Sequence, residues 1–360
     1  MKYLANIKTM NERMNDFYAE SLTGEVVSFP QNVSIVSTFR CNYRCKVCFQ
    51  TDFNGELNWK VMDNIEPILP FVQDLHPFGG EPFLYKRIGD FFNLAHEYDC
   101  RVKIITNGAL IDADMAWNLV AKKIHRLLIS IDAGTAETYT FLRGGDFDQL
   151  LRNLEAIARE KRLQNSPTPH LEFNFLALRS NIAELPGLVD TAARLGVETI
   201  NVFYPKILKE DLIPECLWFS QGLSDDMMLA AIAKGREQGV AVVPTSLFSE
   251  DHKKVQGAVF RSAQKCTRPW RNLNIDIFGN ATLCCFGAPV IGNVQSQDFN
   301  SVWNSELARK IRETVGTDQE FDFCRTCTVR PFSPKNIEYH MPPEIHRKIP
   351  RNLLAASPAR

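Results

Sequence analysis

Short apolar and β-branched runs alternate with longer amphipathic stretches between about residues 33 and 245. This alternation is typical of repeated βα units that build a parallel sheet. The pattern predicts six strands, at residues 33–39, 72–77, 102–106, 127–132, 171–178 and 198–203.

The stretches between these runs show the 3.6-residue period of helices with one apolar face. One such face carries Leu150, Leu154, Ile157 and Ala158, and another carries Leu185, Leu188, Val189, Ala192 and Leu195. Asn181 precedes Glu184 by three residues, which is the spacing of a capping box. We therefore expect the second of these helices to begin at Asn181.

After about residue 250 the pattern changes to that of a β-hairpin. Leu273, Ile275 and Ile277 alternate with polar residues up to the turn pair Gly279-Asn280, and residues 281–286 form the return strand. A helix is expected at about 305–315.

Together these elements predict an α/β fold with a partial (β/α)6 TIM-like barrel and a small C-terminal domain of a β-hairpin plus a helix. The active site of such a barrel lies at the carboxyl ends of its strands. We expect an N-terminal extension at 1–32, the barrel at 33–250, a boundary near 250–262, the appended domain at 262–330 and a tail at 331–360.

The composition is that of an ordinary globular protein. The 360 residues are 45% hydrophobic, and 41 basic residues balance 42 acidic ones, for a net charge of −1. This balance argues against binding to nucleic acid or to a membrane surface through bulk charge. With neither a membrane span nor a signal peptide evident, we expect a cytoplasmic protein, in which ten cysteines serve as metal ligands or reactive thiols.

Three of these cysteines follow the first predicted strand with the spacing Cys41-x-x-x-Cys45-x-x-Cys48. Thiolates this close together on one loop can bind a single inorganic centre such as an iron–sulfur cluster. Three ligands leave one metal position open for chemistry, whereas a structural zinc site takes four. The alternatives are a zinc loop or three unconnected buried thiols.

This loop resembles that of the radical S-adenosylmethionine (SAM) enzymes, in which three such cysteines hold a [4Fe–4S] cluster and SAM binds the fourth iron. Gly79-Gly80-Glu81-Pro82 resembles the family's GGEP motif, which holds the SAM amino group. Paired glycines let the backbone approach a ligand, and Glu81 can accept a hydrogen bond from an ammonium group. By itself, a Gly-Gly pair most often marks only a turn.

Three further positions resemble SAM contacts of the family. Thr106 begins the stretch TNG and Ser130 begins SIDA, and both stretches end predicted strands. Arg143, in FLRGG, resembles the arginine that pairs with the SAM carboxylate; the alternative is a solvated arginine at a helix end. The chain departs from the family at Val47, where an aromatic residue is common, and has Phe49 after the third cysteine.

A second group of cysteines lies in the appended region and resembles the twitch or SPASM extension of radical SAM enzymes. The resemblance rests on CTRPW from Cys266, on IGNV and VWNSELARKIRE, and on Cys324-x-x-Cys327. Cys266, Cys284, Cys324 and Cys327 suffice for one auxiliary [4Fe–4S] cluster, as in the shorter twitch form. Neighbouring residues of a strand face opposite sides, so Cys285 is left as a spare thiol. A zinc ribbon is the competing interpretation.

The resemblance implies reductive cleavage of SAM and abstraction of a hydrogen atom from the substrate, with electrons from an external donor such as flavodoxin or ferredoxin. The single auxiliary cluster favours a small polar substrate (sugar, aminocyclitol or nucleotide) that is oxidised or epimerised in natural product biosynthesis. Cys216 is a candidate hydrogen donor, but a buried apolar cysteine is the favoured interpretation. The alternatives are modification of a ribosomally made peptide and a non-catalytic zinc or iron–sulfur binding module.

Overall fold

The computed structural model describes residues 2–249, 266–284, 288–325, 327 and 337–355. Within these residues, ten strands form one sheet in the order β10-β9-β8-β1-β2-β3-β4-β5-β6-β7. The strands are β1 Asn32–Thr38, β2 Asp74–Gly79, β3 Arg101–Thr106, β4 Arg126–Ser130, β5 His170–Leu176, β6 Thr199–Phe203, β7 Ala241–Pro244, β8 Asn272–Ile275, β9 Asn280–Thr282 and β10 Gly292–Asn293.

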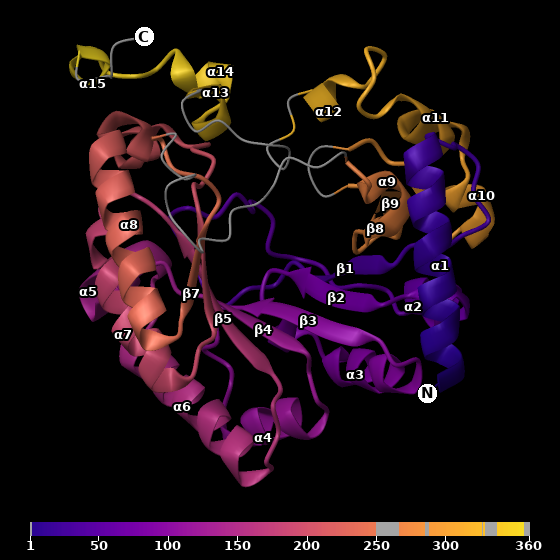
Figure 1. The fold of residues 1–360 in the computed structure, drawn as a ribbon, viewed down its shortest axis with the longest axis horizontal. Coiled ribbons are helices and arrows are strands. Elements are labelled where there is room, and N and C mark those ends of the chain that lie inside the picture. Colours follow the sequence, from indigo (N-terminus) through magenta and orange to yellow (C-terminus); the bar gives the residue numbers. More distant parts are fainter. Residues whose placement is uncertain (1, 250–265, 285–287, 326, 328–336, 356–360) are drawn as a thin grey trace.

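Strands β1 to β7 are all parallel, and Figure 1 shows them as a curved sheet with helices α3–α8 along its outer side. The helices are α1 Lys2–Ser21, α2 Lys60–Ile65, α3 Ile88–Glu97, α4 Ala113–Ala121, α5 Ala136–Arg143, α6 Phe147–Leu163, α7 Leu185–Leu195, α8 Gln221–Gln238, α9 Arg268–Arg271, α10 Phe299–Trp303, α11 Glu306–Thr314, α12 Asp322–Arg325, α13 Ile337–His340, α14 Pro343–His346 and α15 Arg351–Ala355. Fully buried strand residues such as Val33, Ile35 and Leu75 belong to the main hydrophobic core.

This architecture confirms the predicted partial barrel, and the ends of the six predicted strands differ from the observed ones by at most two residues. The structure adds a seventh parallel strand, β7, which the six-unit prediction missed. Strand β7 has only four residues and ends in a proline, so its alternating pattern is too short to stand out.

The predicted capping box at the start of α7 is wrong. Asn181 precedes a short 3-10 turn instead, and its side chain accepts from the Leu178 N–H at 2.8 Å. Glu184 reaches across to the loop after β4, where its carboxylate accepts from the N–H groups of Gly134 and Thr135. Two residues at the spacing of a capping box therefore make other contacts, and those of Glu184 are with a distant segment of the chain.

The predicted β-hairpin is present, and it extends the barrel sheet. Strands β8 and β9 are antiparallel, and Gly279 between them has φ of +85°, which favours glycine. Strand β8 also pairs in parallel with β1, so that Asn272 lies opposite Asn32. Consequently the appended region lies directly beside the strand that leads into Cys41.

The predicted domain division stays a prediction, because its boundary at 250–262 lies outside the described residues, as does Cys285. Residues 337–355 of the predicted tail form the short helices α13–α15. Among the described helices, none combines the length and the apolar character that crossing a bilayer requires.

A fully buried arginine joins three segments of the appended region and the N-terminal segment. Arg312 of α11 donates to the carbonyl oxygens of Pro269 and Gly24, both at 2.9 Å, and its guanidinium lies 4.3 Å from the ring centre of Trp303. Burial lowers the pKa of Arg312 to about 9.

We expect Arg312→Met to lower the free energy of unfolding by about 3 kcal/mol, because two buried carbonyl groups lose their donor. Arg309→Met, one turn earlier on α11, removes an exposed arginine 3.3 Å from Glu25 and should change it by less than about 0.5 kcal/mol. Urea unfolding of both variants measures the difference. Equal midpoints would contradict the assigned role of Arg312.

Candidate functional site

The thiols of Cys41, Cys45 and Cys48 lie in the loop after β1, at the carboxyl ends of the parallel strands. All three are partly exposed free thiols. The Cys48 N–H donates to the Cys45 carbonyl at 3.1 Å, and the Tyr43 N–H donates to the Cys41 sulfur at 3.4 Å. Burial is the main cause of the raised pKa of Cys41 and Cys45, and the nearby charge of Cys48 adds to it. The three thiols are thus close enough to interact.

In the part of the chain that the structure describes, no three His, Cys, Asp or Glu side chains converge as they would around a single metal ion. Cysteine ligands of a [4Fe–4S] cluster bind different iron atoms and are spread around it. Three neighbouring thiols on one exposed loop fit such a donor set.

The glycine pair after β2 packs against this thiol loop. The Gly80 N–H donates to the Thr38 carbonyl, and the Glu81 N–H donates to the Arg40 carbonyl, both at 2.8 Å. Gly79 has φ of +135°, and a Cβ there would overlap the Thr38 carbonyl oxygen; a Cβ on Gly80 would overlap that of Arg40. The absence of side chains therefore serves contact between two loops, whereas the sequence argument assigned it to ligand approach.

Glu81 connects the ends of β2 and β3. Its fully buried carboxylate accepts from the Thr106 hydroxyl at 2.7 Å, the Asn107 N–H at 2.8 Å and the Phe83 N–H at 3.3 Å. Burial raises the pKa of Glu81, against the effect of these hydrogen bonds. The Asn107 side chain also donates to Asn42 of the thiol loop at 2.8 Å. The expectation that Glu81 meets a ligand ammonium group stays a prediction; in the structure its carboxylate ties the ends of β2 and β3 together.

Thr106 and Ser130 differ in what their hydroxyl groups do. The Thr106 hydroxyl, which donates to Glu81, also accepts from the Gly108 N–H at 3.0 Å. Ser130 ends β4 and is partly exposed, and its hydroxyl has no hydrogen-bond partner among the described residues. Thr106 therefore holds its loop in place, while Ser130 can hydrogen-bond a ligand.

Arg143 is the last residue of α5 and is buried, with 8% of its surface exposed. The alternative of a solvated arginine is therefore wrong. Its guanidinium donates to Asp132 at 2.5 Å, and its carbonyl oxygen lies 3.8 Å from the Cys45 sulfur. Burial alone would lower the pKa of Arg143. The negative charges of Asp132 and Cys45 outweigh this effect, so the pKa is raised. Its buried Nε has no partner among the described residues, which fits a carboxylate ligand.

Asp132 is a site residue that the sequence argument missed. It has φ of +51° and is almost fully buried, and besides pairing with Arg143 it accepts from the Leu176 N–H at 2.7 Å. Its carbonyl oxygen accepts from Asn181 at 2.9 Å. The available hint was a charged residue directly after an apolar strand, inside the stretch SIDA.

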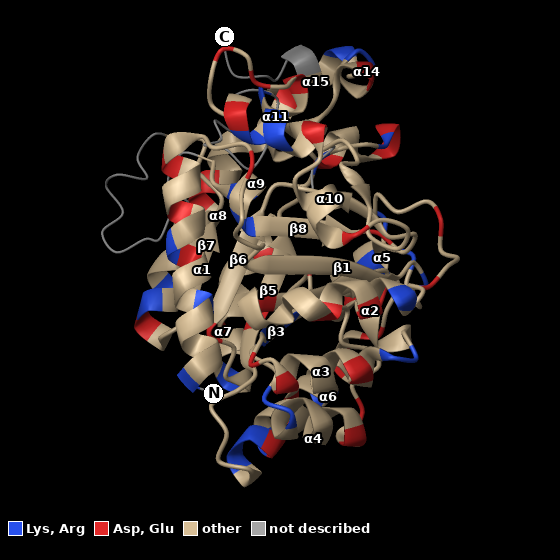
Figure 2. Cartoon of the chain, turned by 90° about the vertical axis from the view of Figure 1, so that its right-hand side faces the viewer, with Lys and Arg blue, Asp and Glu red and all other residues tan. Residues whose placement is uncertain are grey.

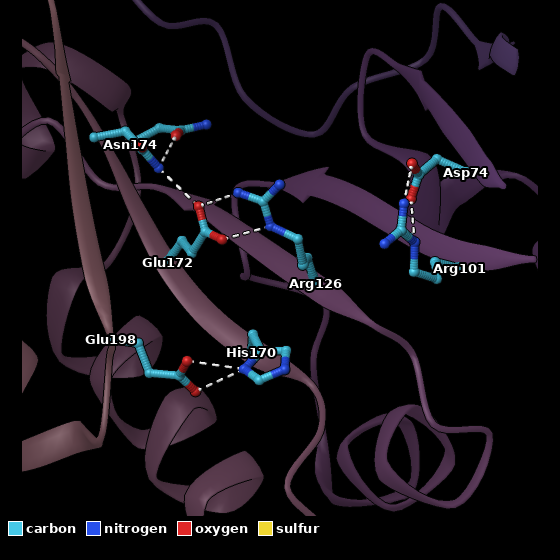
Figure 3. Close-up of polar contacts among 8 residues, drawn as sticks. Asp74, Arg101, Arg126, His170, Glu172, Asn174 and Glu198 are labelled. Atoms are coloured by element: carbon cyan, nitrogen blue, oxygen red, sulfur yellow. Dashed lines mark hydrogen bonds and ion pairs between the residues drawn. The ribbon is translucent and has the colours of Figure 1, made fainter. Parts of the chain in front are cut away.

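Other charged side chains of the sheet pair among themselves, as Figure 3 shows. Arg126 of β4 donates twice to Glu172 of β5, at 2.5 and 2.7 Å, and Asn201 donates to the same carboxylate at 2.8 Å. Burial raises the pKa of Glu172, but these hydrogen bonds outweigh it, so the pKa lies below its usual value. This group is a second, internally satisfied polar network.

The four other predicted ligands lie in the appended region. Cys266 precedes α9 by two residues, Cys284 follows β9 by two residues, and Cys324 lies in α12. The Cys327 N–H donates to the Cys324 carbonyl at 3.3 Å, which repeats the turn formed by Cys45 and Cys48. Strand β9 ends at Thr282, so the strand-face argument that separated Cys284 from Cys285 does not apply.

Cys216 is buried in a small hydrophobic cluster whose core members are Leu142, Leu178, Ile207, Leu212, Ile213, Cys216, Met341, Ile345 and Ile349. Val47 of the thiol loop packs against the same cluster. Burial raises the pKa of Cys216 to about 12. These surroundings support the interpretation of Cys216 as a buried apolar cysteine. They also explain why position 47 carries an aliphatic residue.

Comparisons with known proteins match both cysteine-bearing regions of the chain. Residues 35–166 match the radical SAM superfamily model, and residues 266–328 match the SPASM iron–sulfur cluster-binding domain model. The mycofactocin maturase MftC of Mycobacterium tuberculosis is 25% identical, covering 80% of this chain and 75% of its own. The PqqA peptide cyclase of Granulibacter bethesdensis is 22% identical, covering 84% of this chain and 80% of its own.

Among solved structures, Streptococcus suis SuiB bound to the precursor peptide SuiA has the same fold, with a TM-score of 0.63 at 16% identity. The match covers 85% of this chain and 71% of SuiB. The family models account for both cysteine-bearing regions and imply SAM and iron–sulfur clusters as cofactors. The chain belongs to the radical SAM superfamily and carries a C-terminal SPASM-type iron–sulfur domain.

Proposed function

We propose that this radical SAM enzyme modifies a peptide. The observation that carries the proposal is the similarity, over about four fifths of the chain, to the mycofactocin maturase and the PqqA peptide cyclase. The fold shared with SuiB, a protein that binds a precursor peptide, supports it further. The sequence argument placed a small polar substrate first and a peptide second. We reverse that order, because the count of auxiliary clusters is weaker support than these relatives.

We propose Cys41, Cys45 and Cys48 as ligands of the first cluster, and Cys266, Cys284, Cys324 and Cys327 as ligands of the auxiliary cluster. When bound, the first cluster and SAM supply one-electron chemistry that removes a hydrogen atom from the substrate. Burial raises the pKa of both Cys41 and Cys45, and the buried charge of Arg143 opposes that rise. This charge therefore offsets part of the cost of forming the thiolates that bind iron.

For SAM, we propose that Arg143 contacts the carboxylate through its unpartnered Nε, and that Ser130 contributes its hydroxyl. Backbone groups at Gly79 and Gly80 face the thiol loop and belong to the same site. Glu81 and Thr106 act as positioning residues, because their hydrogen bonds hold the ends of β2 and β3 together.

The test of the proposed function is anaerobic incubation of the reconstituted enzyme with SAM, dithionite and short peptides encoded beside its gene. Aminosugars and nucleotides serve as the comparison set. A peptide should raise 5′-deoxyadenosine formation and change its own mass. Turnover of a small metabolite alone would overturn the peptide assignment and restore the alternative.

We expect Cys45→Ala to lose all detectable SAM cleavage and about four iron atoms per chain, because one ligand of the first cluster is gone. Cys100→Ala is the matched control, since Cys100 directly precedes β3, at the amino ends of the strands, and hydrogen-bonds the Val72 carbonyl at 3.2 Å. Its iron content should be unchanged. Iron and sulfide analysis with a cleavage assay decides, and full iron in the Cys45 variant would contradict the assignment.

We expect Asp132→Asn to weaken SAM binding about tenfold, which corresponds to about 1.4 kcal/mol, because Arg143 loses the anion that orients it. Asp190→Asn removes an exposed carboxylate 2.5 Å from Lys234 and should leave the affinity unchanged. Equilibrium binding of SAM to the reconstituted proteins measures both. Unaltered affinity in the Asp132 variant would show that the ion pair has no positioning role.

A further inference from the structure

The face that helix α1 buries is largely polar, with Lys8, Asn11 and Asn15 besides Ala19. The Lys8 ammonium group donates to the carbonyl oxygens of Tyr98 and Asp99 at 2.8 and 2.6 Å. The side chains of Asn11 and Asn15 both donate to the Phe29 carbonyl at 2.9 Å. Hydrogen bonds to loop carbonyls therefore hold this helix against the molecule.

The outer face of α1 carries an apolar row. Tyr3 is 77% exposed, and Met10 and Phe17 are each 65% exposed. Ile7 and Met14 are partly exposed and fall between them. The five residues follow one another at intervals of four, three, four and three positions, which is the repeat of a coiled-coil seam. We call this row the α1 seam.

The α1 seam lies on the outside of the molecule. Figure 1 shows α1 at the outer edge of the fold, beside β1 and away from helices α5–α8, and the turned view of Figure 2 shows α1 on the face toward the viewer. On the other described helices, large exposed apolar side chains occur singly, as at Trp117 on α4 and Leu163 on α6. A continuous row is unusual on a monomer surface and indicates an interaction site.

We propose that the α1 seams of two copies of this chain pack against each other in an antiparallel, two-fold symmetric dimer. A coiled-coil seam pairs with a helix of the same repeat, and among the described helices α1 is the one that presents such a row. Antiparallel pairing brings exposed Lys2 at one end of α1 toward exposed Glu20 at the other end of the second copy. It also opposes the two helix dipoles favourably.

The size of the seam sets the strength of this dimer. A buried large side chain removes roughly 150–250 Å² from water, so three from each copy bury about 1,000 Å² in total. That area is at the low end of specific interfaces, which begin at about 1,200 Å². The dimer therefore dissociates on dilution and forms at high concentration.

Photo-crosslinking tests the placement. With p-benzoyl-L-phenylalanine at position 10 of the full-length reconstituted protein, irradiation should give a covalent dimer whose crosslinked peptide maps to α1 of the other copy. The control places the same residue at position 163, where Leu163 is 72% exposed on α6. That position should give no dimer. Crosslinks from position 10 to any other segment, or none at all, would overturn the proposal.

Sedimentation velocity over a concentration series tests the energetics. Met10→Glu should weaken dimerisation at least tenfold, because it buries a charge within the seam. Thr9→Glu adds the same charge at an exposed position off the seam and should leave dimerisation unchanged. Circular dichroism should show the same fold in both variants. A monomer at every concentration, or a dimer that tolerates Met10→Glu, would refute the pairing, whatever reaction the enzyme catalyses.

Discussion

The buried ion pair between Arg143 and Asp132 is the contact on which the site depends. Asp132 takes a left-handed backbone conformation after β4 and accepts from Leu176 of β5, so two strand ends meet at its carboxylate. Arg143 brings the end of α5 to the same point, and its carbonyl oxygen lies beside the Cys45 sulfur. Burial raises the pKa of the Cys41 and Cys45 thiols, and the positive charge of Arg143 opposes that rise. Removing either partner would leave an uncompensated buried charge, which costs several kcal/mol.

Much of the fold was predictable because parallel strands buried by helices leave strong local patterns, and six of seven barrel strands showed them. The thiol motif was also readable, since its meaning lies in close spacing. The physical reasons for the residues at other motif positions could not be read from the sequence. Position 80 requires a glycine because a Cβ there would overlap the Arg40 carbonyl oxygen. Glu81 accepts a hydrogen bond from Asn107, which follows the next strand. Such requirements come from contacts between segments distant in sequence, which no local period records.

Val47 shows how a departure from a family pattern can have a packing cause. Its side chain packs against the hydrophobic cluster that contains Leu142 and Cys216, together with Met341 from the C-terminal tail. Leu142 directly precedes Arg143, so this cluster supports the thiol loop and the arginine at once. The tail is separated from Val47 by almost three hundred residues, and its contribution to the site could emerge only in three dimensions.

Two C-terminal segments therefore flank the thiol loop from different directions. Strand β8 extends the sheet at the edge of β1, while Met341 and Ile345 close the hydrophobic cluster around Val47. Both segments lie more than two hundred residues beyond Cys48 in sequence, so the surroundings of the thiol loop depend on packing that no local pattern records.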